Sequence, residues 1–144
     1  MILIKDVAAI LDSKTYKEKV NIAIKDSTIS YVGEAEKQDT YSTVIDGSKY
    51  LALPGFVNTH SHLAMTLMRG YAEDLVLQDW LNKYIFPVEG RLTADMVYFG
   101  TLLAAIEAIK SGTTLISDFY LHPEASLRAL SEIGMRANVG IAYA

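Results

Sequence analysis

The chain has 144 residues, of which 51% are hydrophobic and 21% are charged, and its formal net charge is -4. This composition supplies a core for one ordinary globular domain and argues against an intrinsically disordered chain. A negative charge without a basic cluster disfavours nucleic acid as a partner, and the absence of cysteine excludes disulfides and thiolate metal sites.

The first ten residues are a poor core for a signal peptide, because Lys5 and Asp6 interrupt their apolar run. No run approaches the ~20 apolar residues that span a bilayer. We therefore expect a cytoplasmic protein without a membrane partner.

Residues 1–53 are predicted to form a small β-rich domain. Val20, Ile22 and Ile24 alternate with other residues, Asp26-Ser27 offers a turn, and residues 29–33 form a return strand. This pattern predicts a hairpin within a small antiparallel sheet. The polar residues 34–42 are expected to form a solvated loop, followed by a strand at residues 44–45 and a turn. We predict no chemistry in this domain.

A strand over residues 56–60 follows the Pro54-Gly55 turn and runs into His60 and His62. Side chains alternate along a strand, so these two imidazoles project the same way. Two converging imidazoles on rigid backbone suit a divalent metal of the zinc type. The pattern alone leaves open a second interpretation, in which both are strand-end histidines satisfied by backbone or water.

A loop is expected over residues 63–75, followed by a helix over 77–86 that Pro87 closes. Thr93 is a candidate N-cap for the next helix, with Asp95 in its first turn. The periodic residues predict the buried face of that helix, which ends at Ser111-Gly112; they are Met96, Phe99, Leu103 and Ile106.

Three further elements complete the chain. Residues 113–119 predict a strand with Asp118 near its end, and Pro123 begins a helix whose apolar side is Leu127, Leu130 and Ile133, with Gly134 as its C-cap. Residues 135–143 predict another strand. This alternation implies parallel strands in a barrel or a doubly wound sheet.

The length favours part of a (β/α)₈ TIM barrel over a whole one. A closed barrel takes roughly 250 residues, and residues 54–144 have room for about three strands. We therefore expect a fragment or a split chain whose C-terminal domain is the first part of a barrel.

Other polar residues have two interpretations each. Asp118 suits a metal ligand, an orienting carboxylate, or an acceptor for a nearby backbone amide, and His122 is best interpreted as a loop histidine or local cap. Arg69 is expected to pair with Glu73 or Asp74. Without other information, Trp80 is a packing residue and Glu89 a solvated one.

An ordered series of motifs after residue 46 resembles the amidohydrolase superfamily. Within it, the series is similar to the branch of S-adenosylhomocysteine/methylthioadenosine deaminases and chlorohydrolases. The motifs are residues 54–62, Met65-Thr66, Arg69-Gly70, residues 73–75, Trp80-Leu81, residues 87–89, Gly112, Asp118 and residues 134–137.

The resemblance implies a role for four residues. His60 and His62 would be two ligands of one divalent metal, zinc or else iron, and Trp80 and Glu89 would contact the substrate. Glu89 would accept hydrogen bonds from ribose hydroxyls. In such enzymes the metal activates a water that attacks the purine carbon bearing the amino group. The remaining ligands and the general acid come from later strands, so the resemblance assigns no catalytic residue to this chain and implies that it is inactive alone.

The implied activity is deamination of an adenine nucleoside. Ile141 stands where branch members that bind a homocysteine carboxylate can have arginine, which weakens S-adenosylhomocysteine and leaves methylthioadenosine, adenosine and 5'-deoxyadenosine. The alternatives are a guanine or triazine aminohydrolase or chlorohydrolase, a non-catalytic half-barrel, or a flavodoxin-like binding domain. The expected partners are the nucleoside, the remainder of the barrel and a second copy in a homo-oligomer.

Overall fold

The protein is described by a computed structural model that covers residues 1–35 and 40–141. The chain divides into two compact units, Met1–Pro54 and Gly55–Ala144. The division falls one residue after the predicted boundary between residues 53 and 54.

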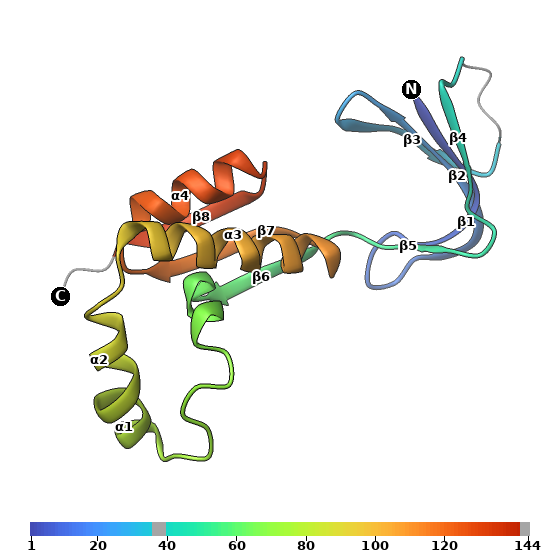
Figure 1. Cartoon of the computed structure of the whole chain (residues 1–144). Helices are drawn as coiled ribbons and strands as arrows, with labels where there is room; N and C mark the ends of the chain where they lie inside the picture. Colours follow the sequence, from blue (N-terminus) through green and yellow to red (C-terminus); the bar gives the residue numbers. More distant parts are fainter. Residues whose placement is uncertain (36–39, 142–144) are drawn as a thin grey trace. The chain divides into compact units, whose positions relative to one another are not determined.

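The N-terminal unit is a mixed five-stranded sheet (Figure 1). Its strands are β1 (Ile2–Ile10), β2 (Tyr16–Lys25), β3 (Thr28–Gly33), β4 (Thr43–Asp46) and β5 (Leu51–Ala52). The predicted hairpin is confirmed, because β2 and β3 pair antiparallel and Asp26 adopts a positive φ of 54° between them. The expectation of a purely antiparallel sheet is wrong. Both β4 and β5 pair parallel to β1, because neither is joined to β1 by a hairpin. The predicted loop over residues 34–42 lies partly outside the described residues.

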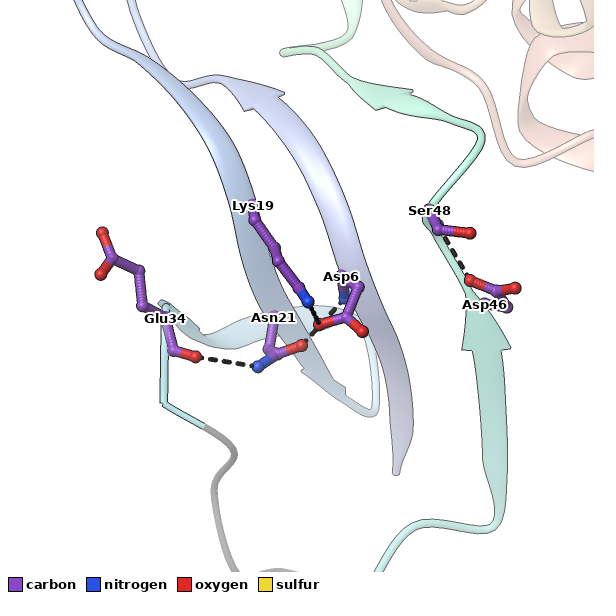
Figure 2. Close-up of polar contacts among 6 residues, drawn as sticks. All are labelled: Asp6, Lys19, Asn21, Glu34, Asp46 and Ser48. Carbon is purple, nitrogen blue, oxygen red and sulfur yellow. Dashed lines mark hydrogen bonds and ion pairs between the residues drawn. The ribbon is translucent and has the colours of Figure 1, made fainter.

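A buried asparagine fixes the irregular course of β1 (Figure 2). Asn21 is 4% exposed, accepts a hydrogen bond from the Asp6 N–H at 3.0 Å, and donates one to the Glu34 carbonyl at 3.2 Å. Asp6 has a positive φ of 59°, and the β1–β2 register shifts between Ile4 and Val7. Asn21 therefore satisfies one backbone N–H at the register shift of β1 and one carbonyl directly after β3, which is a structural role.

The C-terminal unit is a parallel three-stranded sheet in the order β6-β7-β8, with helices α3 and α4 packed side by side (Figure 1). Its elements are β6 (Phe56–Ser61), η1 (Leu63–Met68), α1 (Leu77–Asp79), η2 (Trp80–Ile85), α2 (Phe86–Glu89), α3 (Ala94–Lys110), β7 (Thr113–Tyr120), α4 (Pro123–Glu132) and β8 (Arg136–Ile141). The order of strands and helices agrees with the prediction. Residues 142 and 143 of the last predicted strand lie outside the described residues.

Helix α3 begins and ends as predicted, but its buried face differs. The Thr93 side chain accepts a hydrogen bond from the Met96 N–H, and Asp95 lies in the first turn. The predicted buried residues are instead 42–63% exposed, namely Met96, Phe99, Leu103 and Ile106. The buried side carries smaller residues, Val97, Gly100, Thr101, Ala104 and Ala105. A Cβ on Gly100 would lie 2.8 Å from the Ala64 carbonyl oxygen, so only small residues allow η1 to approach this closely.

Helix α4 shows a similar difference. Pro123 is its first residue and Gly134 follows it with a positive φ of 73°, as predicted. Leu130 is 2% exposed, but Leu127 is 52% exposed. Its other buried residues are small, namely Ala125, Ser126 and Ala129. A buried 3.2 Å hydrogen bond joins Ser126 to Thr101 on α3.

Two predictions between residues 63 and 89 are wrong. The expected loop begins with the 3₁₀ helix η1, and the helical run over 77–89 continues past Pro87. Proline cannot donate a backbone hydrogen bond and normally interrupts a helix. Here the π-helix η2 widens the turn before it, since the Phe86 N–H bonds to the Leu81 carbonyl.

Arg69 does not pair with Glu73 or Asp74. It instead makes two hydrogen bonds, of 3.1 and 2.6 Å, with Glu107 on α3. The bidentate pair joins the end of η1 to α3. Both oxygens of the Glu107 carboxylate are engaged, which makes the pair stronger and more specific than a single contact.

No single helix in the described ranges is long and apolar enough to cross a membrane. The helical run over 77–89 and α3 reach that length and apolar composition only when they are taken together, and they are bent by 115° relative to each other.

Candidate functional site

Strand β6 brings two imidazoles together at its C-terminal end. The ring centroids of His60 and His62 are 5.0 Å apart and the rings are nearly perpendicular, at 82°. His60 is exposed and His62 is half-buried directly after the strand. This arrangement leaves one face of the pair open to solvent.

The ring of His62 is fixed by a backbone carbonyl. Its Nδ1 atom lies 2.5 Å from the Phe119 carbonyl oxygen. A carbonyl oxygen only accepts hydrogen bonds, so Nδ1 carries the proton and Nε2 keeps its lone pair. This tautomer is the one in which a histidine binds metal through Nε2 while its other nitrogen is held by a carbonyl.

Asp118 lies beside this pair at the end of β7. It is 2% exposed. Its Oδ1 atom accepts a hydrogen bond from the Leu63 N–H at 2.8 Å and lies 3.2 Å from the Ser61 hydroxyl, which shares its single proton with the Ser117 carbonyl. Burial raises the pKa of its carboxyl group, and the hydrogen bonds from Leu63 and Ser61 oppose that rise. Of the interpretations left open for Asp118, the bond to a nearby backbone amide is present.

His122 lies apart from this constellation. It occupies the N-cap position of α4 with a positive φ of 49°, and its Nε2 atom lies 3.1 Å from the Leu92 carbonyl oxygen. This agrees with the interpretation of His122 as a loop histidine.

The donor atoms fit a zinc ion in kind and supply part of a site. Neutral imidazole nitrogens are common zinc ligands, but a catalytic zinc takes about three protein ligands. Across residues 1–35 and 40–141, no group of three or more His, Asp or Glu side chains is placed to hold a metal ion. Within these ranges the candidate donors are the two imidazoles of His60 and His62, fewer than such a site requires.

A pocket of about 270 Å³ adjoins His62 and brings both predicted substrate residues to it. Its walls are mainly apolar, and it is lined by His62, Met65, Trp80, Leu81, Ile85, Phe86, Glu89, Phe119, Tyr120 and Leu121. Trp80 and Glu89 are half-buried and come from the helical run over 77–89. A mostly apolar pocket with a few polar groups is typical of small-molecule sites.

Tyr120 is a pocket residue that sequence reasoning missed. It is 6% exposed, and its hydroxyl has no hydrogen-bond partner among the described residues. Burial raises the pKa of the phenol, and the carboxylates of Glu89 and Asp118 raise it further. The signal was its position two residues after Asp118, on the same buried face of β7.

Residues 51–143 match the sequence signature of the amidohydrolase family. The chain belongs to the amidohydrolase family. The match covers the whole site described above, from β6 through the pocket to β8.

Two relatives illustrate the similarity within this family. A 5-methylthioadenosine/S-adenosylhomocysteine deaminase from Thermoanaerobacter pseudethanolicus is 44% identical over 94% of this chain and 32% of its own length. A 5'-deoxyadenosine deaminase from Methanobrevibacter smithii is 49% identical over 94% of this chain and 31% of its own length. The chain thus spans about a third of the length of the amidohydrolases that it resembles.

Solved structures show the same fold. A zinc complex of atrazine chlorohydrolase from Arthrobacter aurescens superimposes with a TM-score of 0.89 at 24% identity, covering 98% of this chain and 35% of that one. An adenosine deaminase from Xanthomonas campestris with bound zinc gives 0.88 at 28% identity, covering 94% and 32%. The predicted fold class is confirmed, because the β-rich sheet and three parallel strands match the N-terminal part of amidohydrolase structures.

Proposed function

We propose that this chain forms the N-terminal portion of a metal-dependent aminohydrolase that deaminates an adenine nucleoside. The observation that carries the proposal is the imidazole pair, with Nε2 of His62 left free, at the rim of a pocket that contains Glu89. The names of the deaminases that are 44–49% identical over 94% of this chain support the nucleoside as substrate class.

Each named residue has one task in this proposal. His60 and His62 hold a zinc ion, which supplies an activated water at neutral pH when it is bound. Glu89 accepts hydrogen bonds from the ribose hydroxyls, because a carboxylate is an acceptor only. Trp80 and the apolar wall pack against the flat purine and exclude water from it.

The pocket also favours an uncharged 5' substituent. Its described lining contains Glu89 and no lysine or arginine, so the carboxylate of a homocysteine moiety finds no partner there. We therefore propose methylthioadenosine, 5'-deoxyadenosine or adenosine ahead of S-adenosylhomocysteine.

The decisive experiment combines intact mass, metal analysis and an activity assay on the purified protein with any chain that copurifies. We expect a zinc or iron ion, ammonia release from 5'-deoxyadenosine, and loss of the metal in His60→Ala and His62→Ala. The mass of this chain alone, with no copurifying partner and no metal, would contradict the proposal and favour a non-catalytic half-barrel.

A guanine or triazine aminohydrolase or chlorohydrolase is the alternative within the family. Adenine nucleosides, guanine and a chlorotriazine should therefore be assayed in parallel. Turnover of the heterocycles without turnover of the nucleosides would replace the proposed substrate class.

A further inference from the structure

Three consecutive residues, Ser61, His62 and Leu63, are bonded to the end of β7, and His62 is one of the two proposed metal ligands. The Ser61 hydroxyl donates to the Ser117 carbonyl at 2.9 Å, His62 Nδ1 contacts the Phe119 carbonyl, and the Leu63 N–H donates to Asp118 Oδ1 at 2.8 Å. His62 is therefore fixed through its own ring and through the residues before and after it.

Asp118 is the central acceptor of this group, and its burial needs an explanation. Burying a carboxylate is unfavourable unless hydrogen bonds compensate for the lost water. Oδ1 receives the Leu63 N–H and a share of the Ser61 hydroxyl proton, which also points to the Ser117 carbonyl, whereas Oδ2 is buried without a partner among the described residues. An apolar side chain would fill this place without that penalty, so packing alone does not account for an aspartate here.

We propose that Asp118 is a positioning residue for the histidine pair. By binding Ser61 and the Leu63 N–H, it holds the backbone on both sides of His62 so that Nδ1 reaches the Phe119 carbonyl and Nε2 faces the open side with His60. These contacts hold His62 whether or not a metal is bound. The expected effect of Asp118 on zinc binding rests on the proposed function.

The tautomer of His62 tests the geometry directly. Nitrogen NMR of the imidazoles, recorded on the neutral rings, distinguishes a proton on Nδ1 from one on Nε2. We expect the Nδ1–H form of His62 in the wild-type protein, a mixture of both forms in Asp118→Ala, and a nearly wild-type spectrum in Asp118→Asn. Asparagine retains a carbonyl oxygen that can accept the Leu63 N–H. An unchanged tautomer in a folded Asp118→Ala protein would overturn the proposal.

Two serine substitutions form a matched pair. Ser61→Ala removes a hydroxyl that donates to the end of β7, and Ser126→Ala removes a buried hydroxyl that pairs with Thr101 between α3 and α4. Ser61→Ala should shift the tautomer of His62 in the same direction as Asp118→Ala, and Ser126→Ala should not. If Asp118→Ala does not fold, this pair decides alone, and equal spectra for the two serine variants refute the positioning role.

Zinc affinity separates this inference from the proposed function. Loss of a group that orients a metal-binding histidine typically weakens metal binding by about 10- to 100-fold, so we expect that loss in Asp118→Ala and partial rescue in Asp118→Asn. If the tautomer shifts but the wild-type protein, with any copurifying chain, binds no zinc, the positioning role stands and the proposed function fails. If the wild-type protein binds zinc and Asp118→Ala changes neither tautomer nor affinity, the function stands and the positioning role fails.

Discussion

At the scale of single residues, the site combines few polar groups with an apolar wall. Glu89 is the single acidic side chain in the described lining of the pocket, and it lies there with Trp80, His62 and Tyr120. A lone carboxylate in such surroundings is suited to a ligand that brings hydroxyl donors. A flat heterocycle without hydroxyl groups offers this carboxylate no such donor.

On the proposed function, and in the protein with any copurifying chain, Glu89→Ala should impair nucleoside turnover far more than turnover of a bare heterocycle. A hydrogen bond to a charged group contributes about 1.5–3 kcal/mol, so we expect kcat/KM for 5'-deoxyadenosine to fall by about 10- to 100-fold. The ratio of kcat/KM for 5'-deoxyadenosine to that for its 2',3'-dideoxy analogue measures the effect.

Glu73→Ala, which removes an exposed loop carboxylate, is the matched control and should leave that ratio unchanged. Equal losses for both substrates in Glu89→Ala would contradict a role in binding the ribose.

Tyr120→Phe should leave the ligand-free protein as stable as before or make it more stable. The hydroxyl is buried and, among the described residues, makes no hydrogen bond of good geometry, and an unsatisfied buried polar group costs about 1–3 kcal/mol. Chemical denaturation measures the free energy of unfolding. Tyr98→Phe is the comparison, because the Tyr98 hydroxyl donates to Glu132 Oε2 and its removal should not stabilise the protein. A clear loss of stability in Tyr120→Phe would indicate that its hydroxyl has a partner after all.

At the scale of elements, the small residues of α3 decide which side is buried. Gly100 lies against η1, where a Cβ would meet the Ala64 carbonyl oxygen at 2.8 Å and the Leu67 Cγ at 2.9 Å. The segment η1 directly follows His62, so this close approach links the helix to the strand that carries the imidazoles.

Gly100→Ala should destabilise the protein although alanine favours helices. Overpacking a close contact typically costs about 1–3 kcal/mol, which exceeds the gain in helix propensity of roughly 1 kcal/mol. Gly90→Ala provides the contrast, because Gly90 has a helical φ of -62° and its nearest neighbour for a Cβ is 3.4 Å away. Thermal or chemical denaturation should show a loss for Gly100→Ala and little change or a gain for Gly90→Ala. The same sign for both would argue against the packing explanation.

The elements were more predictable from sequence than their faces. Thr93, Pro123 and Gly134 act through local backbone chemistry, so their positions at helix ends were correctly predicted. The buried side of α3 depends on which neighbour approaches closely, and a helix that is apolar on several sides does not reveal this. The predicted helix end at Pro87 is wrong for a similar reason, because the sequence pattern does not indicate the π-turn that accommodates this proline.

The site was predictable only in part. The spacing of His60 and His62 follows from strand geometry, and the structure brings the two rings together. The contacts of Asp118 arise from the pairing of β6 with β7, which joins residues more than fifty positions apart in sequence, and Tyr120 reaches the pocket from the end of the same strand β7. Periodicity within one segment does not contain such information.

At the scale of the whole molecule, large apolar side chains remain on the surface of the C-terminal unit. Phe99 is 63% exposed and Leu103 is 45% exposed on α3, and neither is among the buried residues of that helix. Large apolar side chains that gather on a surface commonly mark contact with another protein or a tendency to aggregate.

We expect the isolated chain to self-associate with increasing concentration, and substitution on α3 to reduce this. Phe99→Gln removes apolar surface from the centre of the exposed side while glutamine retains a good helix propensity. Ile29→Gln is matched for exposure, because Ile29 is also 63% exposed, but it lies on β3 in the N-terminal unit. Light scattering after size-exclusion chromatography should show a smaller average mass at a given concentration for Phe99→Gln, with Ile29→Gln close to wild type. If both variants reduce association equally, general surface hydrophobicity drives the association. If neither variant reduces it, the edges of the parallel sheet are the better explanation, because free strand edges pair readily.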